Sequence, residues 1–256
     1  MHSLVLQISQ DALQFYYPAV ADAKATSYGA DQRLSFQKSL EQAATEEAQR
    51  LGGIEHVDVL VEGLVQPVPM NDFAEDDISK LYQYVVPTDE PLSVFYDTLP
   101  ASNAVLLFAL PRMVARSVEA QFPGCIFRSA QTVPLANFAR QSAKAVRTQL
   151  HVVLRGLAAD VALFAEGRLL FCNTFEVQAP QDVVYFALGA AKTLGFDIVA
   201  DEVFLHGNAP QVQSVSEAMK PYVAHLTALP ALPDVPFGIS EFVSSGRFTP
   251  KGEAGE

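Results

Sequence analysis

The chain has 256 residues, of which half are hydrophobic and 18% are charged, so it is long enough and apolar enough for one large domain or two small ones. It carries 29 acidic and 17 basic residues, a net charge of −12. This excess of negative charge disfavours nucleic acid and anionic membranes as partners, because both require cationic groups on the protein. The same charge is also what solubility alone would demand.

The cysteines Cys125 and Cys172 lie in separate apolar segments and form no pair with metal-ligand spacing. We therefore expect buried, reduced thiols and a cytoplasmic location. The N-terminus has no basic region followed by an apolar run, so no signal peptide is predicted. The apolar runs are shorter than the ~20 residues that a membrane-spanning helix needs.

The first part of the chain alternates between strand and helix patterns. Apolar stretches at 4–8 and 13–17, separated by a turn at 9–11, predict a hairpin, and a third strand is predicted at 26–30. Apolar residues then recur at helical spacing from 34 to 51 and end at Gly52-Gly53. Further elements are predicted as strands at 57–61, 92–97, 104–110 and 124–128 and as helices at 72–84, 111–122 and 132–147.

The second part repeats this order more clearly. Strands are predicted at 150–154, 161–165, 169–175, 202–205 and 223–228, and helices at 180–194 and 211–220. The tail after Pro230 is rich in Pro, Gly and Ser and is predicted to be irregular and frayed at its end.

Each half therefore reads as three hairpin-linked strands followed by alternating helices and strands, an α/β layout with mixed sheets. We expect a first half at residues 1–147 and a second half at 148–256. Five prolines fall between residues 64 and 100, which predicts an inserted subdomain in the first half.

A duplicated ribonuclease-H-like layout of this kind resembles the actin and sugar-kinase superfamily. More narrowly, the chain resembles an uncharacterised domain-of-unknown-function family of Bacteroides-type bacteria with an actin-like ATPase fold. The resemblance implies a cleft between the halves in which Mg-ATP would bind. Its best local match runs from Val152 through Gly156 and Asp160 to Leu169, which is similar to the second phosphate-binding hairpin of the superfamily.

The match departs from the superfamily pattern at the residues that bind nucleotide. Leu154 stands where the superfamily has Asp, and the first hairpin has Gln7-Ile8-Ser9-Gln10 in place of Asp-x-Gly. The third motif, His206-Gly207-Asn208, keeps one glycine of the usual pair. Candidate cleft residues are Gly156, Asp160, His206, Gly207 and Asn208, each of which also has an ordinary structural explanation as part of a turn or a helix start.

Nothing in the pattern assigns a catalytic residue or a metal ligand. A magnesium nucleotide needs a carboxylate for the metal and glycines that let the backbone approach the phosphates, and these motif positions are largely missing. The sequence thus favours a non-catalytic actin-like scaffold or assembly protein, a bacterial pseudo-ATPase with an unknown protein partner and no cofactor. The alternatives are an ATPase or kinase with a diverged Mg-ATP site between the halves, and a ligand sensor without turnover.

Overall fold

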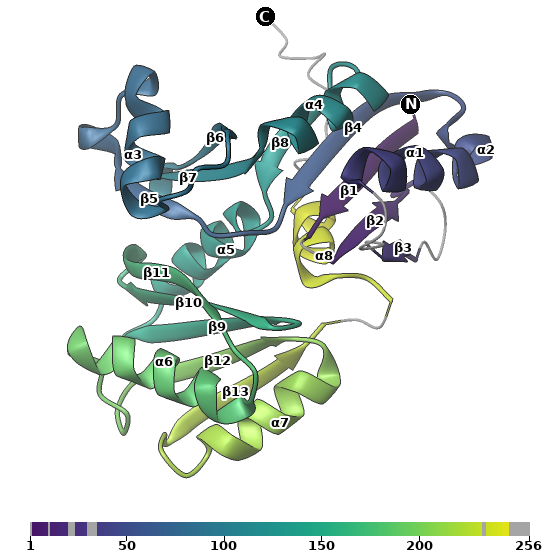
Figure 1. Cartoon of the computed structure of the whole chain (residues 1–256). Helices are drawn as coiled ribbons and strands as arrows, with labels where there is room; N and C mark the ends of the chain where they lie inside the picture. The colour runs from purple at the N-terminus through teal and green to yellow at the C-terminus, as the bar shows by residue number, and fades with distance from the viewer. Residues whose placement is uncertain (1, 10, 20–23, 30–34, 232–233, 246–256) are drawn as a thin grey trace, which may run out of the picture.

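The computed structural model describes residues 2–9, 11–19, 24–29, 35–231 and 234–245. Within them the chain forms two five-stranded mixed sheets and one three-stranded sheet. Figure 1 places the first sheet and the three-stranded sheet in the upper part of the molecule and the second five-stranded sheet in the lower part. Among the described residues, no helix is both long and apolar enough to cross a bilayer.

The first sheet has the order β3-β2-β1-β4-β8. Its strands are β1 (His2–Ile8), β2 (Ala12–Tyr16), β3 (Thr26–Gly29), β4 (Ile54–Val61) and β8 (Ile126–Ser129). The first three strands are antiparallel neighbours, β4 is parallel to β1, and β8 is parallel to β4. Parallel addition requires helical crossovers, which are α1 (Phe36–Glu46) with the short α2 (Ala48–Leu51), and α4 (Arg112–Gln121).

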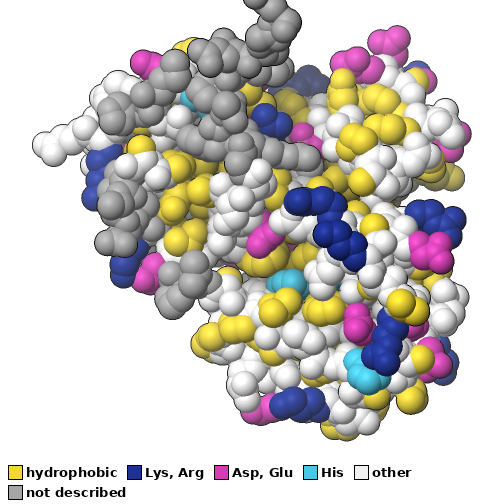
Figure 2. Space-filling model, turned by 180° about the vertical axis from the view of Figure 1, so that it is seen from behind, with side chains coloured by type: hydrophobic (Ala, Val, Ile, Leu, Met, Phe, Trp, Pro, Cys, Tyr) yellow, Lys and Arg dark blue, Asp and Glu magenta, His cyan; other side chains and the backbone are white. Residues whose placement is uncertain are grey.

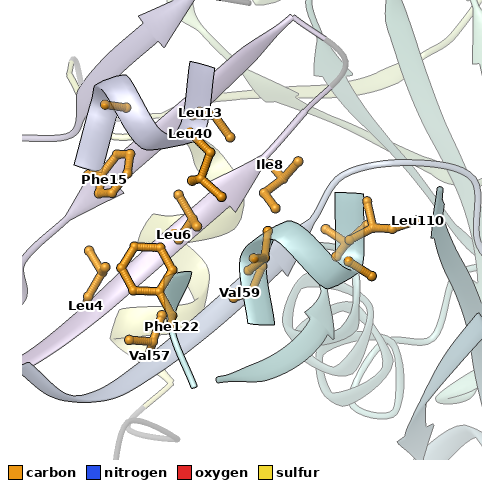
Figure 3. Packing of buried hydrophobic residues seen from close by; sticks show 14 of the residues in the cluster. Leu4, Leu6, Ile8, Leu13, Phe15, Leu40, Val57, Val59, Leu110 and Phe122 are labelled. Atoms are coloured by element: carbon orange, nitrogen blue, oxygen red, sulfur yellow. The ribbon is translucent and has the colours of Figure 1, made fainter. Parts of the chain in front are cut away.

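Helices cover both faces of this sheet. On one face, Leu4, Leu6 and Phe15 of the sheet pack against α1 and α4, and Figure 3 shows these side chains together with Leu40 of α1. Ser35 starts α1 by accepting a hydrogen bond from the Lys38 backbone N–H. The other face packs against α8 (Phe237–Ser244).

The second sheet has the order β11-β10-β9-β12-β13. Its strands are β9 (Gln149–Arg155), β10 (Ala158–Ala165), β11 (Arg168–Glu176), β12 (Glu202–Gly207) and β13 (His225–Pro230). Helices α6 (Pro180–Thr193) and α7 (Ala209–Met219) cover one face, and α5 (Thr132–Ser142) covers the other. The two sheets share the same strand connectivity, which is the repeat predicted from the element order.

The three-stranded sheet has the order β5-β7-β6 and is antiparallel throughout. It consists of β5 (Gln66–Pro69), β6 (Leu92–Leu99) and β7 (Ala104–Pro111), with α3 (Ile78–Val85) packed on it. Short 3-10 turns lie at Met70–Asp72, Glu75–Asp77 and Pro100–Ser102. The sheet therefore reaches to Pro111, beyond the proline-rich segment 64–100 in which we expected an inserted subdomain.

Most expected elements are present, with one correction. The predicted irregular tail contains α8, whose Ile239 and Phe242 are buried against Val5 and Leu60. The chain thus returns from the second sheet to the first. The turn residue Gln10, the strand end Ala30 and the helix start Leu34 fall outside the described residues, and the division into halves at 147/148 stays a prediction.

Candidate functional site

A cleft of about 1470 Å³ opens between the two five-stranded sheets. Segments on either side of it come from far apart in the sequence. The first sheet contributes the β1–β2 hairpin and the segment after β4, and the second contributes the β9–β10 hairpin and the start of α7. This is the ligand position that the resemblance to the actin superfamily implies.

Arg155 and Asp160 form a bidentate ion pair at the base of the cleft. Arg155 Nε and one terminal nitrogen donate to the two carboxylate oxygens of Asp160, each at 2.6 Å. Asp160 is paired across the β9–β10 ladder with Val153, two residues before Arg155, so both side chains project from the same face of the sheet. Burial alone would lower the pKa of Arg155, but the neighbouring carboxylates of Asp160 and Glu62 outweigh it and hold the pKa above its usual range.

Glu62 connects the Arg155–Asp160 ion pair to the first sheet. It follows β4, and its Oε2 lies 3.6 Å from the second terminal nitrogen of Arg155. Its Oε1 accepts a hydrogen bond of 2.9 Å from Gln7 Nε2, which also donates to Gln14 Oε1 at 3.1 Å. Burial raises the pKa of the Glu62 carboxyl, and Arg155 opposes that rise only in part.

Two further side chains complete the hydrogen bonding of Asp160. Thr174 Oγ1, directly opposite on β11, donates to Asp160 Oδ1 at 2.7 Å. Gln131 Nε2 bonds the Gly63 carbonyl at 2.6 Å and reaches the same Asp160 oxygen at 3.4 Å. We call this set the polar network: Gln7, Gln14, Glu62, Gln131, Arg155, Asp160 and Thr174.

The polar network leaves little for a metal ion to bind. Both oxygens of Asp160 already face a guanidinium, and a divalent cation placed there would meet the positive charge of Arg155 at close range. Within the described part of the chain, no group of three or more His, Cys, Asp or Glu side chains has a metal-binding arrangement. The positive charge next to the Asp160 carboxylate is therefore that of Arg155.

The sequence-predicted residues separate into two groups. Gly156, Gly207 and Asn208 line the cleft, whereas Asp160 and His206 are buried beneath it. Asn208 caps α7, with Oδ1 accepting from the Gln211 backbone N–H at 2.9 Å. No ligand contact is thereby assigned to any of the five, and their role in binding stays a prediction.

Gly207 has a clear packing role. Its φ of +135° lies where side chains are rarely found, and a Cβ there would lie 2.7 Å from the Leu154 carbonyl oxygen. Gly156 has a φ of +55° in the two-residue β9–β10 turn, with open space around the position of its missing Cβ. The two glycines are therefore required for different reasons, close backbone approach at Gly207 and turn geometry at Gly156.

His206 forms a buried pair with His151. The distance from His206 Nε2 to His151 Nδ1 is 3.2 Å, and the rings of both stack on Phe138. Burial lowers the pKa of His206 to about 4. Burial and the neighbouring His206 also lower the pKa of His151 well below its usual range, so both imidazoles are neutral at pH 7.

Sequence reasoning missed the residues at the centre of this site. Glu62 and Gln131 belong to no motif, and Arg155 lies within the matched hairpin only at the position between Leu154 and Gly156, where the pattern specifies no residue. The remaining signal was weak: a charged residue at the end of a buried strand, as at Val61-Glu62 and Leu154-Arg155. Two such strand ends that face one cleft bring opposite charges together. Their pairing depends on the packing of the two sheets, which spacing within one segment does not reveal.

The two mixed sheets with a cleft between them form an actin-like ATPase fold, and similar solved structures have the same fold. A Bacteroides thetaiotaomicron protein with actin-like ATPase fold and unknown function superposes with a TM-score of 0.83 at 20% identity, covering 95% of each chain. A PilM-PilN type IV pilus biogenesis complex gives a TM-score of 0.55 at 11% identity, covering 90% of this chain and 88% of the other. At these identities the likeness concerns the fold alone.

Residues 1–226 match the model of the DUF3822 family, described as a protein of unknown function. The chain belongs to this family. Among curated proteins, a comparison found no match.

Proposed function

We propose that this protein is a non-catalytic actin-like scaffold or assembly protein whose cleft does not turn over ATP. The observation that carries the proposal is the position of Arg155, bonded to Asp160 on its own sheet and facing Glu62 on the other. Phosphoryl transfer from ATP depends on a metal that bridges the phosphates and on a group that orients the attacking water. Here the central carboxylate is committed to an arginine instead.

The surface and the fold are compatible with a protein partner. On the face in Figure 2, acidic and basic side chains lie interspersed among hydrophobic ones. The similar PilM fold occurs in a complex of pilus biogenesis, and this parallel is an analogy at the level of the fold. The unpaired thiols of Cys125 and Cys172 fit a cytoplasmic location.

Phosphate release from Mg-ATP tests the absence of turnover. The wild-type protein and Asp160→Asn are expected to release phosphate at the same rate as buffer. Release by the wild type that Asp160→Asn abolishes would show a working ATPase and would refute the proposal.

Sedimentation over a concentration series tests the assembly role, for which self-association that rises with concentration is expected. A strict monomer with no defined partner would count against that role.

A further inference from the structure

One terminal nitrogen of Arg155 makes no short hydrogen bond within the polar network. A guanidinium carries five N–H groups, and Asp160 accepts from two of its nitrogens. The remaining terminal nitrogen lies 3.6 Å from Glu62 Oε2, longer than the ~3.2 Å limit of an ordinary hydrogen bond. Arg155 is one of the residues that line the cleft, and 14% of its side chain is exposed. We call the terminal nitrogen that faces Glu62 its outer side.

The charges around the cleft restrict which anion could approach. Its lining includes the acidic residues Asp11, Glu62, Glu176, Asp182 and Asp234. Among the described residues, the basic ones in this lining are Arg155 and Lys24, and Lys24 is bonded to Asp234 at 2.6 Å. A multiply charged phosphate would meet more repulsion here than a singly charged group. A carboxylate also matches the planar donors of a guanidinium.

We propose that the outer side of Arg155 binds the carboxylate of a ligand, and that the Glu62 side chain competes with this ligand for Arg155. The ligand carboxylate takes the position now held loosely by Glu62 Oε2, while Glu62 keeps its hydrogen bond from Gln7. The inference rests on the proposed function, because it treats the cleft as a metal-independent binding site. The carboxylate belongs either to a small organic acid or to the end of a polypeptide, for which the cleft has room.

The test follows the Nε–H resonance of Arg155 by NMR, in EDTA and at constant ionic strength. The resonance is assigned by its disappearance in Arg155→Lys. Acetate is the probe, and acetamide is its uncharged counterpart. We expect acetate to shift the resonance and acetamide to leave it unchanged. No shift with acetate, an equal shift with acetamide, or tighter binding of inorganic phosphate would overturn the proposal.

Two variants separate competition by Glu62 from a general effect of charge. Glu62→Gln removes the competitor and should tighten acetate binding about fivefold, the scale of one partly exposed ion pair. Glu176→Gln removes the same charge from the cleft lining without touching Arg155, and should change the affinity by less than about twofold. Equal effects of the two variants, or weaker binding in Glu62→Gln, would overturn the role of Glu62.

Affinities for N-acetyl-trialanine, measured for the free acid and for its C-terminal amide, distinguish a small organic acid from the end of a polypeptide. Binding of the acid at least about tenfold tighter than acetate, lost in the amide, supports a polypeptide end, and equal affinity supports a small acid. Failure of the proposed function is detected separately, as release of phosphate from Mg-ATP. A protein that releases none and ignores acetate would refute the inference alone.

Discussion

Arg155 donates two hydrogen bonds of 2.6 Å to Asp160, so both oxygens of this carboxylate in the second sheet already face a cation. The same local view changes the meaning of Gly207 and His206. Both are the last residues of β12, and the sequence predicted them as ligand contacts. Gly207 is required by the approach of the Leu154 carbonyl, and His206 is part of a buried aromatic stack.

Substituting Gly207 tests the first of these interpretations. Gly207→Ala places a Cβ against Leu154 in an unfavourable backbone conformation and should lower the free energy of unfolding by about 2–4 kcal/mol. Gly156→Ala is the matched control, since its surroundings are open, and should cost about 1–2 kcal/mol. Urea denaturation measures both. A Gly207→Ala variant as stable as wild type would contradict the packing role.

The buried histidines predict a loss of stability in acid. Their pKa values are lowered on folding, so the unfolded chain binds protons more readily as the pH falls. The contribution of His206 is complete above its ordinary value of 6.5 and declines as the pH falls towards about 4.

Urea midpoints at pH 7, 5.5 and 4.5 check this dependence. His151→Phe combined with His206→Phe should flatten it, whereas His225→Gln, at an exposed position, should leave it unchanged. An equally steep decline in the double variant would assign the acid sensitivity to other groups.

At the level of elements, the sequence predicted the sheets well and the packing between them poorly. Buried runs such as 150–154 and 161–165 identify their strands because apolar residues dominate both of these short segments. Helix α8 was missed because its segment, Phe237-Gly238-Ile239-Ser240, follows prolines and includes a glycine. A Cβ at Gly238 would lie 3.0 Å from Gln7 Oε1, so this glycine permits contact with the first sheet, a reason that exists only in the folded protein.

The contribution of α8 can be measured at Phe242, which is 1% exposed against the first sheet. Phe242→Ala should lower the free energy of unfolding by about 3–5 kcal/mol, because it removes a buried aromatic ring. Ser244→Ala lies on the exposed side of the same helix and should change it by less than about 0.5 kcal/mol. If both variants had similarly small effects on the free energy of unfolding in urea, the packing of α8 against the first sheet would be contradicted.

Across the whole molecule, α5 and the polar network join the two five-stranded sheets. Val133 of α5 packs with the first sheet, while Leu135 and Phe138 pack with the second. Gln131 and Glu62 then reach across the base of the cleft to Asp160 and Arg155. The element order predicted this two-sheet architecture, but the charges that meet in the cleft come from segments that only the tertiary structure brings together.

We propose that the internal Arg155–Asp160 ion pair leaves the cleft without a bound magnesium nucleotide. Thermal unfolding with millimolar Mg-ATP, against magnesium chloride alone, tests it most directly. A ligand at 100 times its dissociation constant adds about 2.7 kcal/mol of stability, which would raise the midpoint by several degrees. We predict no rise over the magnesium control. A rise of several degrees that EDTA abolishes would mean that Mg-ATP binds in spite of Arg155, and would contradict the account.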